Sequence, residues 1–403
     1  MRWDRRMLDA PARPRPPAVQ RLRASVPPGG ALVPIALAVG AITACVAALF
    51  GSRLSGTPQI PVLPGLPDAG EFTRLAMPLA RTAFDVVAVG LCGSLLLGLV
   101  LLPRRHADLA LSIEAAMRSA ARCAWALAAT AVALLLLTLS EVLARPLPRV
   151  LSWDILGQFA YSFDATRALM SSALLAVLTA VAAGSEASRA TRTLTGLLAA
   201  ATLIPPLLAG HSGHARYHYL AVASLSVHVL SASIWIGGLL ALALALGRGR
   251  GPAGHTPLVT ALPRFSRVAL FCCVAVGLSG AVNAWIRLAT VDQLWLTPYG
   301  RLILAKTAAL VVLAGFGWWH RRRTIQAVRD RRPRAFVLLA AVEVAIMLTT
   351  VGLAVALART PPPTAPGHAR TSAAGLSTHL RIFQSDRPVA TGPRSPEHNR
   401  WGG

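Results

Sequence analysis

Three histidines lie within nine residues of the sequence, in the stretch GHSGHARYH that begins at Gly210. His211, His214 and His218 are spaced i, i+3 and i+7, so a helical conformation would place all three side chains on one face. Imidazole nitrogen is a ligand that suits copper, zinc, iron and nickel. The spacing therefore indicates a metal-binding cluster, and the alternative is an ordinary solvated polar loop.

A fourth histidine, His228, follows His218 by ten residues and lies inside a long apolar run. At 1.5 Å per residue, a helix would carry His228 ~15 Å deeper than His218. An ionisable side chain in a membrane helix is costly, so it is by default a functional-site hypothesis. The alternative is a neutral imidazole that hydrogen-bonds to a neighbouring helix or to Ser224, four residues earlier. The histidines together suggest a path, with a cluster at its mouth and one imidazole partway down.

Four further polar side chains are expected within the membrane, namely Asp85, Asn283, Lys306 and Glu343. Lys306 and Glu343 enter their helices from opposite sides of the membrane, so their charged ends could meet and pair, which would lower the cost of both. Asp85 follows Arg81 by four residues, a spacing that allows a local ion pair. These groups are open to two interpretations, a pair that locks the bundle and a relay for protons or ions.

The composition is that of a membrane protein, with 54% hydrophobic and only 14% charged residues and a mean hydropathy of +0.56. The net charge is +24, yet the basic residues cluster between apolar runs and are not interleaved with aromatic ones. Such clusters indicate membrane topology and not a nucleic-acid partner. The five cysteines form no CxxC pair and are expected to be small apolar helix residues. No P-loop is present, so nothing couples ATP to transport.

Nine apolar runs approach the ~20 residues that a bilayer crossing needs. We therefore predict an all-α fold, a polytopic membrane bundle of about nine transmembrane helices. The run 194–209 contains Pro205 and Pro206, so we expect its helix to end early or kink there. The predicted spans are roughly 31–50, 79–102, 121–143, 165–184, 194–209, 219–246, 267–288, 301–319 and 335–357.

Arginine is concentrated in the N-terminal segment and after every second span, which predicts a cytoplasmic N-terminus and a C-terminus outside. The predicted organisation is a basic cytoplasmic segment (1–30), five membrane helices (31–209), a four-span membrane domain (210–358) and an extracytoplasmic tail (359–403). The tail is rich in Pro, Ser and Gly and has few apolar residues, so we expect it to be disordered.

The segment 205–363 resembles the copper resistance protein D (CopD) family. Four stretches carry the resemblance, and they occur together and in order: HVLSASIWIGGLLAL (228–242), LPRFSRVALFCCVAVGLSGAVNAW (262–285), LTPYGRLILAKTAAL (296–310) and EVAIMLTTVGLAVALARTPPP (343–363). Each stretch is weak evidence alone, and the set is specific. The Gly-His…His segment before them is similar to a longer actinobacterial branch of the family.

The resemblance implies a multi-pass protein of the bacterial plasma membrane that handles copper, for import or resistance, without enzymatic turnover. It implies His211, His218 and His228 as candidate copper ligands, whereas His214 is not part of the family pattern. A partner implied in this way is an extracytoplasmic copper carrier, beside the lipid bilayer itself. Imidazole ligation suits Cu(II) and, with two or three ligands, Cu(I), so the oxidation state stays open.

The resemblance also implies that Trp235, Gly237 and Gly238 are a packing element, because small residues let membrane helices approach closely. Two alternative functions are compatible with these residues. One is delivery of copper to a membrane cupro-oxidase, or assembly of that enzyme. The other is a haem or redox protein, which needs two imidazoles at matching depth on facing helices. Only His228 lies deep in a span, which disfavours haem.

Overall fold

The computed structural model describes residues 29–54, 68–104, 106–185, 188–209, 218–248, 252–319, 322, 333–360 and 363. Across these ranges the chain forms helices and turns and no strand. Nearly all of the predicted segment 1–30, the tail from 361 apart from residue 363, and the predicted loop histidines His211 and His214 lie outside the described residues.

Eight helices in the described ranges are long and apolar enough to cross a bilayer, which confirms an all-α membrane bundle. They are α2 (Gly70–Leu96, continued by the π-helix η1, Leu97–Leu101), α3 (Ala110–Val142), α6 (Asp164–Gly184), α7 (Arg189–Thr202, followed by α8, Pro205–Leu208), α9 (His218–Arg248), α10 (Pro252–Arg287), α12 (Pro298–Trp319) and α14 (Pro333–Arg359).

The first predicted span coincides with α1 (Gly29–Leu54), whose described apolar stretch is Ala38–Phe50. The count of nine crossings and the orientation of the two ends therefore stay predictions. The break predicted at the two prolines is confirmed, because α7 ends at Thr202 and the short α8 begins at Pro205.

Several helices extend beyond the apolar runs that predicted them. α2 begins at Gly70 and α3 at Ala110, about three turns before the predicted starts. Helical hydrogen bonding continues past the bilayer edge, and an ion pair such as Arg118 with Glu114, at i and i+4, supports the extra turns of α3. Short helices occur in the connections: η2 (Ala107–Leu109), α4 (Leu147–Val150), α5 (Trp153–Phe159) and α11 (Gln293–Leu296).

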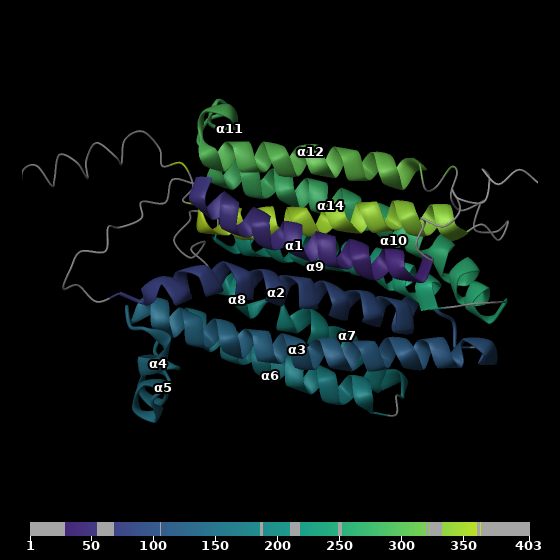
Figure 1. Cartoon of the computed structure of the whole chain (residues 1–403), viewed down its shortest axis with the longest axis horizontal. Coiled ribbons are helices and arrows are strands. Elements are labelled where there is room, and N and C mark those ends of the chain that lie inside the picture. Colours follow the sequence, from purple (N-terminus) through teal and green to yellow (C-terminus); the bar gives the residue numbers. More distant parts are fainter. Residues whose placement is uncertain are drawn as a thin grey trace, which may run out of the picture.

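Helix α2 lies at the centre of the bundle (Figure 1). It packs against α3 on one side, where α6 and then α7 follow, and against α9, α1 and α14 on the other. α12 runs along one edge, in contact with α14 and α10. The core is formed by aliphatic side chains from these helices, among them the fully buried Leu91, Leu127, Leu139, Leu242, Met347 and Leu348.

The crossing of α2 and α9 depends on two glycines that face each other. A Cβ atom on Gly93 would overlap the backbone of Gly237, and a Cβ on Gly237 would overlap the Val89 carbonyl. No side chain separates the two helices at this point. Close backbone approach through small residues is a principal source of helix association in membranes, where lipid and protein are equally apolar.

The first and last helices of the bundle, α1 and α14, form another close pair. A Cβ on Gly352 would overlap the Ala44 carbonyl, and one on Gly40 would press on Leu348. Across the same interface the hydroxyls of Thr43 and Thr349 share a hydrogen bond of 2.8 Å. Helices that are nearly 300 residues apart in the sequence therefore lie side by side.

Burial is uneven among the helices. In the most apolar window of α2, α3, α9 and α14 at least half of the residues are buried, whereas the shares are 11% for α10 and 6% for α12. α10 and α12 therefore keep fewer side chains fully inside the bundle, and exposed apolar side chains such as Phe271, Leu278 and Val311 lie on their outer surfaces.

Candidate functional site

His228 lies in α9 within a hydrogen-bonded cluster that joins α9 to the antiparallel α10. Its Nδ1 atom is 3.1 Å from the hydroxyl oxygen of Ser279 on α10. The Ser224 hydroxyl, one turn earlier on α9, donates to the Ser279 carbonyl at 3.0 Å. The Asn283 side-chain amide donates both to the Ser224 hydroxyl at 3.0 Å and to the Ser279 carbonyl at 2.9 Å. Four polar side chains thus form one hydrogen-bonded cluster inside an apolar region.

Serine and asparagine occur here at helical spacing, which explains why the cluster forms. Ser224 and His228 are four residues apart on α9, and Ser279 and Asn283 are four residues apart on α10. Each pair therefore occupies one helix face. The close fit of the ring against Gly280, whose Cβ position lies 3.5 Å from the ring Cε1, lets the imidazole reach α10.

The alternative in which His228 bonds to a neighbouring helix is the one that the structure adopts; its hydrogen bond runs to Ser279 and not to Ser224. The Ser279 hydroxyl has one hydrogen, and its shortest contact is the Ala275 carbonyl at 2.6 Å. When the hydroxyl donates there, His228 Nδ1–H donates to the Ser279 oxygen and Nε2 keeps its lone pair. The backbone of Val276 is a further hydrogen-bond partner of the ring.

One acceptor in the cluster has no partner among the described residues. The Oδ1 atom of Asn283 is buried and accepts no hydrogen bond, although the Nδ2 atom of the same amide donates two. A buried carbonyl oxygen without a donor is costly, so this atom is available to an incoming donor or cation.

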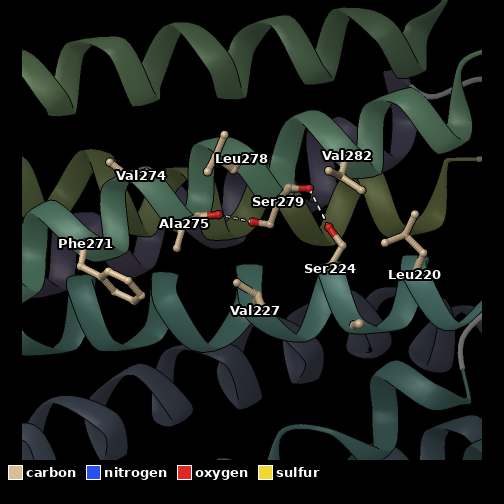
Figure 2. A pocket seen from close by; sticks show the side chains of 10 residues that line it. Leu220, Ser224, Val227, Phe271, Val274, Ala275, Leu278, Ser279 and Val282 are labelled. Atoms are coloured by element: carbon tan, nitrogen blue, oxygen red, sulfur yellow. Dashed lines mark hydrogen bonds between the residues drawn. The ribbon is translucent and has the colours of Figure 1, made fainter.

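An open apolar groove of about 420 Å³ lies beside the cluster, between α9 and α10 (Figure 2). Ser224 and Ser279 line it and are joined by the hydrogen bond drawn there. The rest of its lining is aliphatic or aromatic: Leu220, Ala223, Val227, Phe271, Val274, Ala275, Leu278 and Val282. The polar cluster is therefore bordered by a surface that suits a hydrocarbon chain and not a charged ligand.

Two basic side chains lie near the cluster, one on α12 and one at the end of α10. Lys306 on α12 is close enough to His228 for their charges to interact, and Arg287, at the end of α10, is close enough to Lys306. The ion pairs formed by the described residues include none between Lys306 and Glu343. Glu343 is buried on α14, with 2% of its surface exposed, and its pairing with Lys306 stays a prediction.

The local pair predicted between Arg81 and Asp85 is present, with 3.6 Å between Nε and Oδ1. Both side chains lie on α2, far along the chain from the histidines, and the structure gives no contact between this pair and His228. Asp85 is therefore a balanced charge within α2 and stands apart from the His228 cluster.

Of the three histidines in the stretch 210–218, only His218 is described. It is the first residue of α9, is half-buried, and its ring centroid lies 5.4 Å from that of Tyr219. It thus begins the helix that carries His228, nearly three turns further on. Within the described part of the chain, no group of three or more His, Cys, Asp or Glu side chains is placed to hold a metal ion.

The packing element expected at Trp235, Gly237 and Gly238 lies on α9 two turns beyond His228. Trp235 is 6% exposed. Gly238 is enclosed by Phe265 and Leu96, just as Gly237 is enclosed by α2. These residues pack α9 between α2 and α10, and so hold the helix that carries the imidazole.

Residues 259–357, which span α10 to α14, match the family model described as Copper resistance protein D. The family expected from the sequence is thereby confirmed for this part of the chain. A curated relative, the copper transport protein CutJ of Bacillus subtilis (strain 168), is 27% identical over 147 residues. That match covers 36% of this chain and 27% of the relative, so the chain aligns with about a quarter of the relative's length.

No solved structure matches the chain. The eight apolar helices, together with the match to the family model over residues 259–357, indicate a multi-pass bacterial membrane protein. Asn283, Lys306 and Glu343 fall within the matched residues, whereas His218 and His228 precede them.

Proposed function

We propose that the protein is a copper permease in which histidines at the mouth of the path capture the ion and His228 receives it within the membrane. His211 and His218 are the proposed capture ligands, with His214 as a further candidate. The outward-facing position of this cluster, predicted from the arginine distribution, favours import. The protein carries out no chemical conversion of the ion in this proposal.

The observation that carries the proposal is the arrangement of His228. A histidine that binds a metal donates its second ring N–H to a partner, which orients the ring and raises its basicity. Ser279 supplies such a partner at Nδ1, which leaves Nε2 as the ring nitrogen with a lone pair for a metal ion. An intramembrane imidazole held in this way is prepared to accept a metal ion.

The small number of ligands also fits transport better than storage. A transported ion must bind well enough to enter the path and weakly enough to leave it. A single imidazole, supplemented by an oxygen such as Asn283 Oδ1, binds more weakly than a closed site of three or four ligands. The absence of a three-ligand group among the described residues is thus compatible with a transfer point.

The proposal is tested by copper accumulation in cells that express the wild type or His228→Ala. We expect accumulation and copper sensitivity to fall to the level of cells without the protein. His106→Ala is the matched control, because His106 is an exposed histidine in the connection between α2 and α3. Equal accumulation in wild type and His228→Ala, at equal protein in the membrane, would remove His228 from the mechanism.

Elemental analysis of the purified protein separates binding from transport. The wild type is expected to retain copper after desalting, and a variant lacking His211, His218 and His228 is expected to retain none. Copper in both samples would place the binding site elsewhere in the chain.

A further inference from the structure

A cluster of positive charge lies at the end of the bundle opposite His218, where the α2 span ends. The π-helix η1 closes at Leu101, and the chain then turns extended at Leu102. Arg264 of α10 donates from Nη1 to the Leu101 carbonyl at 2.9 Å. This carbonyl belongs to the last turn of the helix, where the backbone lacks its usual partner. Arg264 thereby holds one guanidinium at the Leu101 carbonyl, three residues before the exposed Arg104 in the sequence.

Helix α7 brings another arginine to the same place. Gly196 of α7 faces Leu99, with 3.8 Å between its Cβ position and Leu99 Cδ1. Arg192 lies one turn earlier on the same face of α7, so it is directed past Leu99 toward Arg104. Partial desolvation, and then the positive charge of Arg192, lower the pKa of Arg104. The two guanidiniums are thus close enough to repel each other.

No carboxylate balances these charges in the described part of the chain. None of its ion pairs includes Arg104, Arg192 or Arg264. The first turn of α7 contains no acidic residue, and its N-terminal end adds the positive pole of a helix dipole. Three arginines and a helix N-terminus therefore lie at this end of the bundle, and none of the ion pairs among the described residues includes these arginines.

The position of the arginines relative to the ends of the apolar spans indicates which kind of anion binds there. Leu101 ends one apolar span and Arg189 begins another, so the arginines lie where lipid headgroups meet the hydrocarbon. Val100, one residue inside that level, is 56% exposed and offers apolar surface to an acyl chain. A zwitterionic headgroup would bring an ammonium toward three guanidiniums, whereas an anionic one brings only negative charge.

We propose that Arg104 and Arg192, with Arg264 at the Leu101 carbonyl as a further positive charge, bind the phosphate of an anionic phospholipid at this end of the bundle. A phosphodiester accepts hydrogen bonds from planar guanidinium groups in a two-pronged geometry, which suits arginine better than lysine. The bound lipid relieves the repulsion between Arg104 and Arg192 and joins α2 to α7. This site is independent of the copper path.

The test is native mass spectrometry of the detergent-purified full chain with added phosphatidylglycerol or phosphatidylcholine. Arg104→Gln/Arg192→Gln is expected to retain phosphatidylglycerol roughly thirtyfold more weakly than the wild type, because each arginine near a headgroup contributes a factor of roughly five. Arg118→Gln is the control, since Arg118 is exposed near the start of α3 and already paired with Glu114.

Three results would overturn the proposal. They are equal retention of phosphatidylglycerol by the wild type and the double variant, equally strong retention of phosphatidylcholine by the wild type, and displacement of the lipid by inorganic phosphate at equal concentration. Arg104→Lys/Arg192→Lys, which keeps the charge and loses the planar geometry, is expected to fall between the wild type and the glutamine variant. An unchanged unfolding midpoint in lipid-free detergent verifies that each variant is folded.

Discussion

Replacing Gly237 with alanine is expected to destabilise the bundle, although alanine is the better helix former. The added methyl carbon would lie more than 1 Å inside the ordinary contact distance of about 3.5 Å from the Val89 carbonyl. Overpacking of this kind costs about 1–3 kcal/mol, and the upper end applies because a backbone carbonyl cannot rotate away. The higher helix propensity of alanine offsets about 1 kcal/mol of this cost, so the free energy of unfolding should fall by about 2 kcal/mol.

Glycines elsewhere in the protein supply matched controls for the same substitution. Gly317 of α12 has no atom within 4 Å of its Cβ position, so Gly317→Ala should leave stability unchanged or raise it by up to about 1 kcal/mol. Gly238 meets side-chain ends of Phe265 and Leu96, which can shift, so its alanine variant should lose about 1 kcal/mol. The expected order of stability is Gly317→Ala, then Gly238→Ala, then Gly237→Ala.

The assay is reversible unfolding of the purified protein in mixed micelles of increasing dodecyl sulfate content, followed by tryptophan fluorescence. Trp235 is buried two residues from Gly237 and reports directly on the α2–α9 crossing. If Gly237→Ala and Gly317→Ala unfold at the same dodecyl sulfate fraction, the two helices do not meet backbone to backbone at Gly237 and the reasoning is refuted.

Two further measurements test specific contacts. Ser279→Ala should weaken copper binding by His228 roughly 10–100-fold, which is the usual effect of removing the partner of a ligating histidine. The control Ser94→Ala should leave copper affinity unchanged, and chelator competition measures both variants. An unchanged affinity in Ser279→Ala would mean that the hydroxyl does not orient the ring. Valine at Thr43 and Thr349 should show a coupling of about 0.6 kcal/mol in a double-mutant cycle of unfolding, the average for hydrogen bonds between membrane helices; additive effects would indicate that the hydroxyls do not bond.

The sequence predicted the helices well and their lengths less well. A helix that crosses a bilayer requires a minimum apolar length, so each crossing is recognisable as a run of apolar residues in the sequence. Nothing comparable marks where a helix stops beyond the bilayer, and the eleven residues by which α3 precedes its run are mixed polar and apolar. The short helices α4 and α5 were not predicted, because four to seven residues are too few to show a period.

For the candidate site, the sequence indicated which residues matter and could not indicate their partners. An isolated histidine in an apolar run is conspicuous, and this pattern marks His228 as a candidate site residue. Its contact with Ser279 depends on how α9 and α10 are aligned against each other, and a spacing of 51 residues carries no such information. Gly237 shows the same limit, since nothing in the sequence around Gly93 marks it as the facing glycine.

The pairing of α1 with α14 has a consequence for biosynthesis. Thr43 and Thr349 are separated by 306 residues, and at ~5–20 residues per second a ribosome needs roughly 15–60 s to make that length. The predicted crossing of α1 therefore requires this helix to remain in the bilayer without its principal neighbour during this time. The stretch ALVPIALAVGAITACVAALF carries no charge on any face, so lipid can surround α1 until the last helix is inserted.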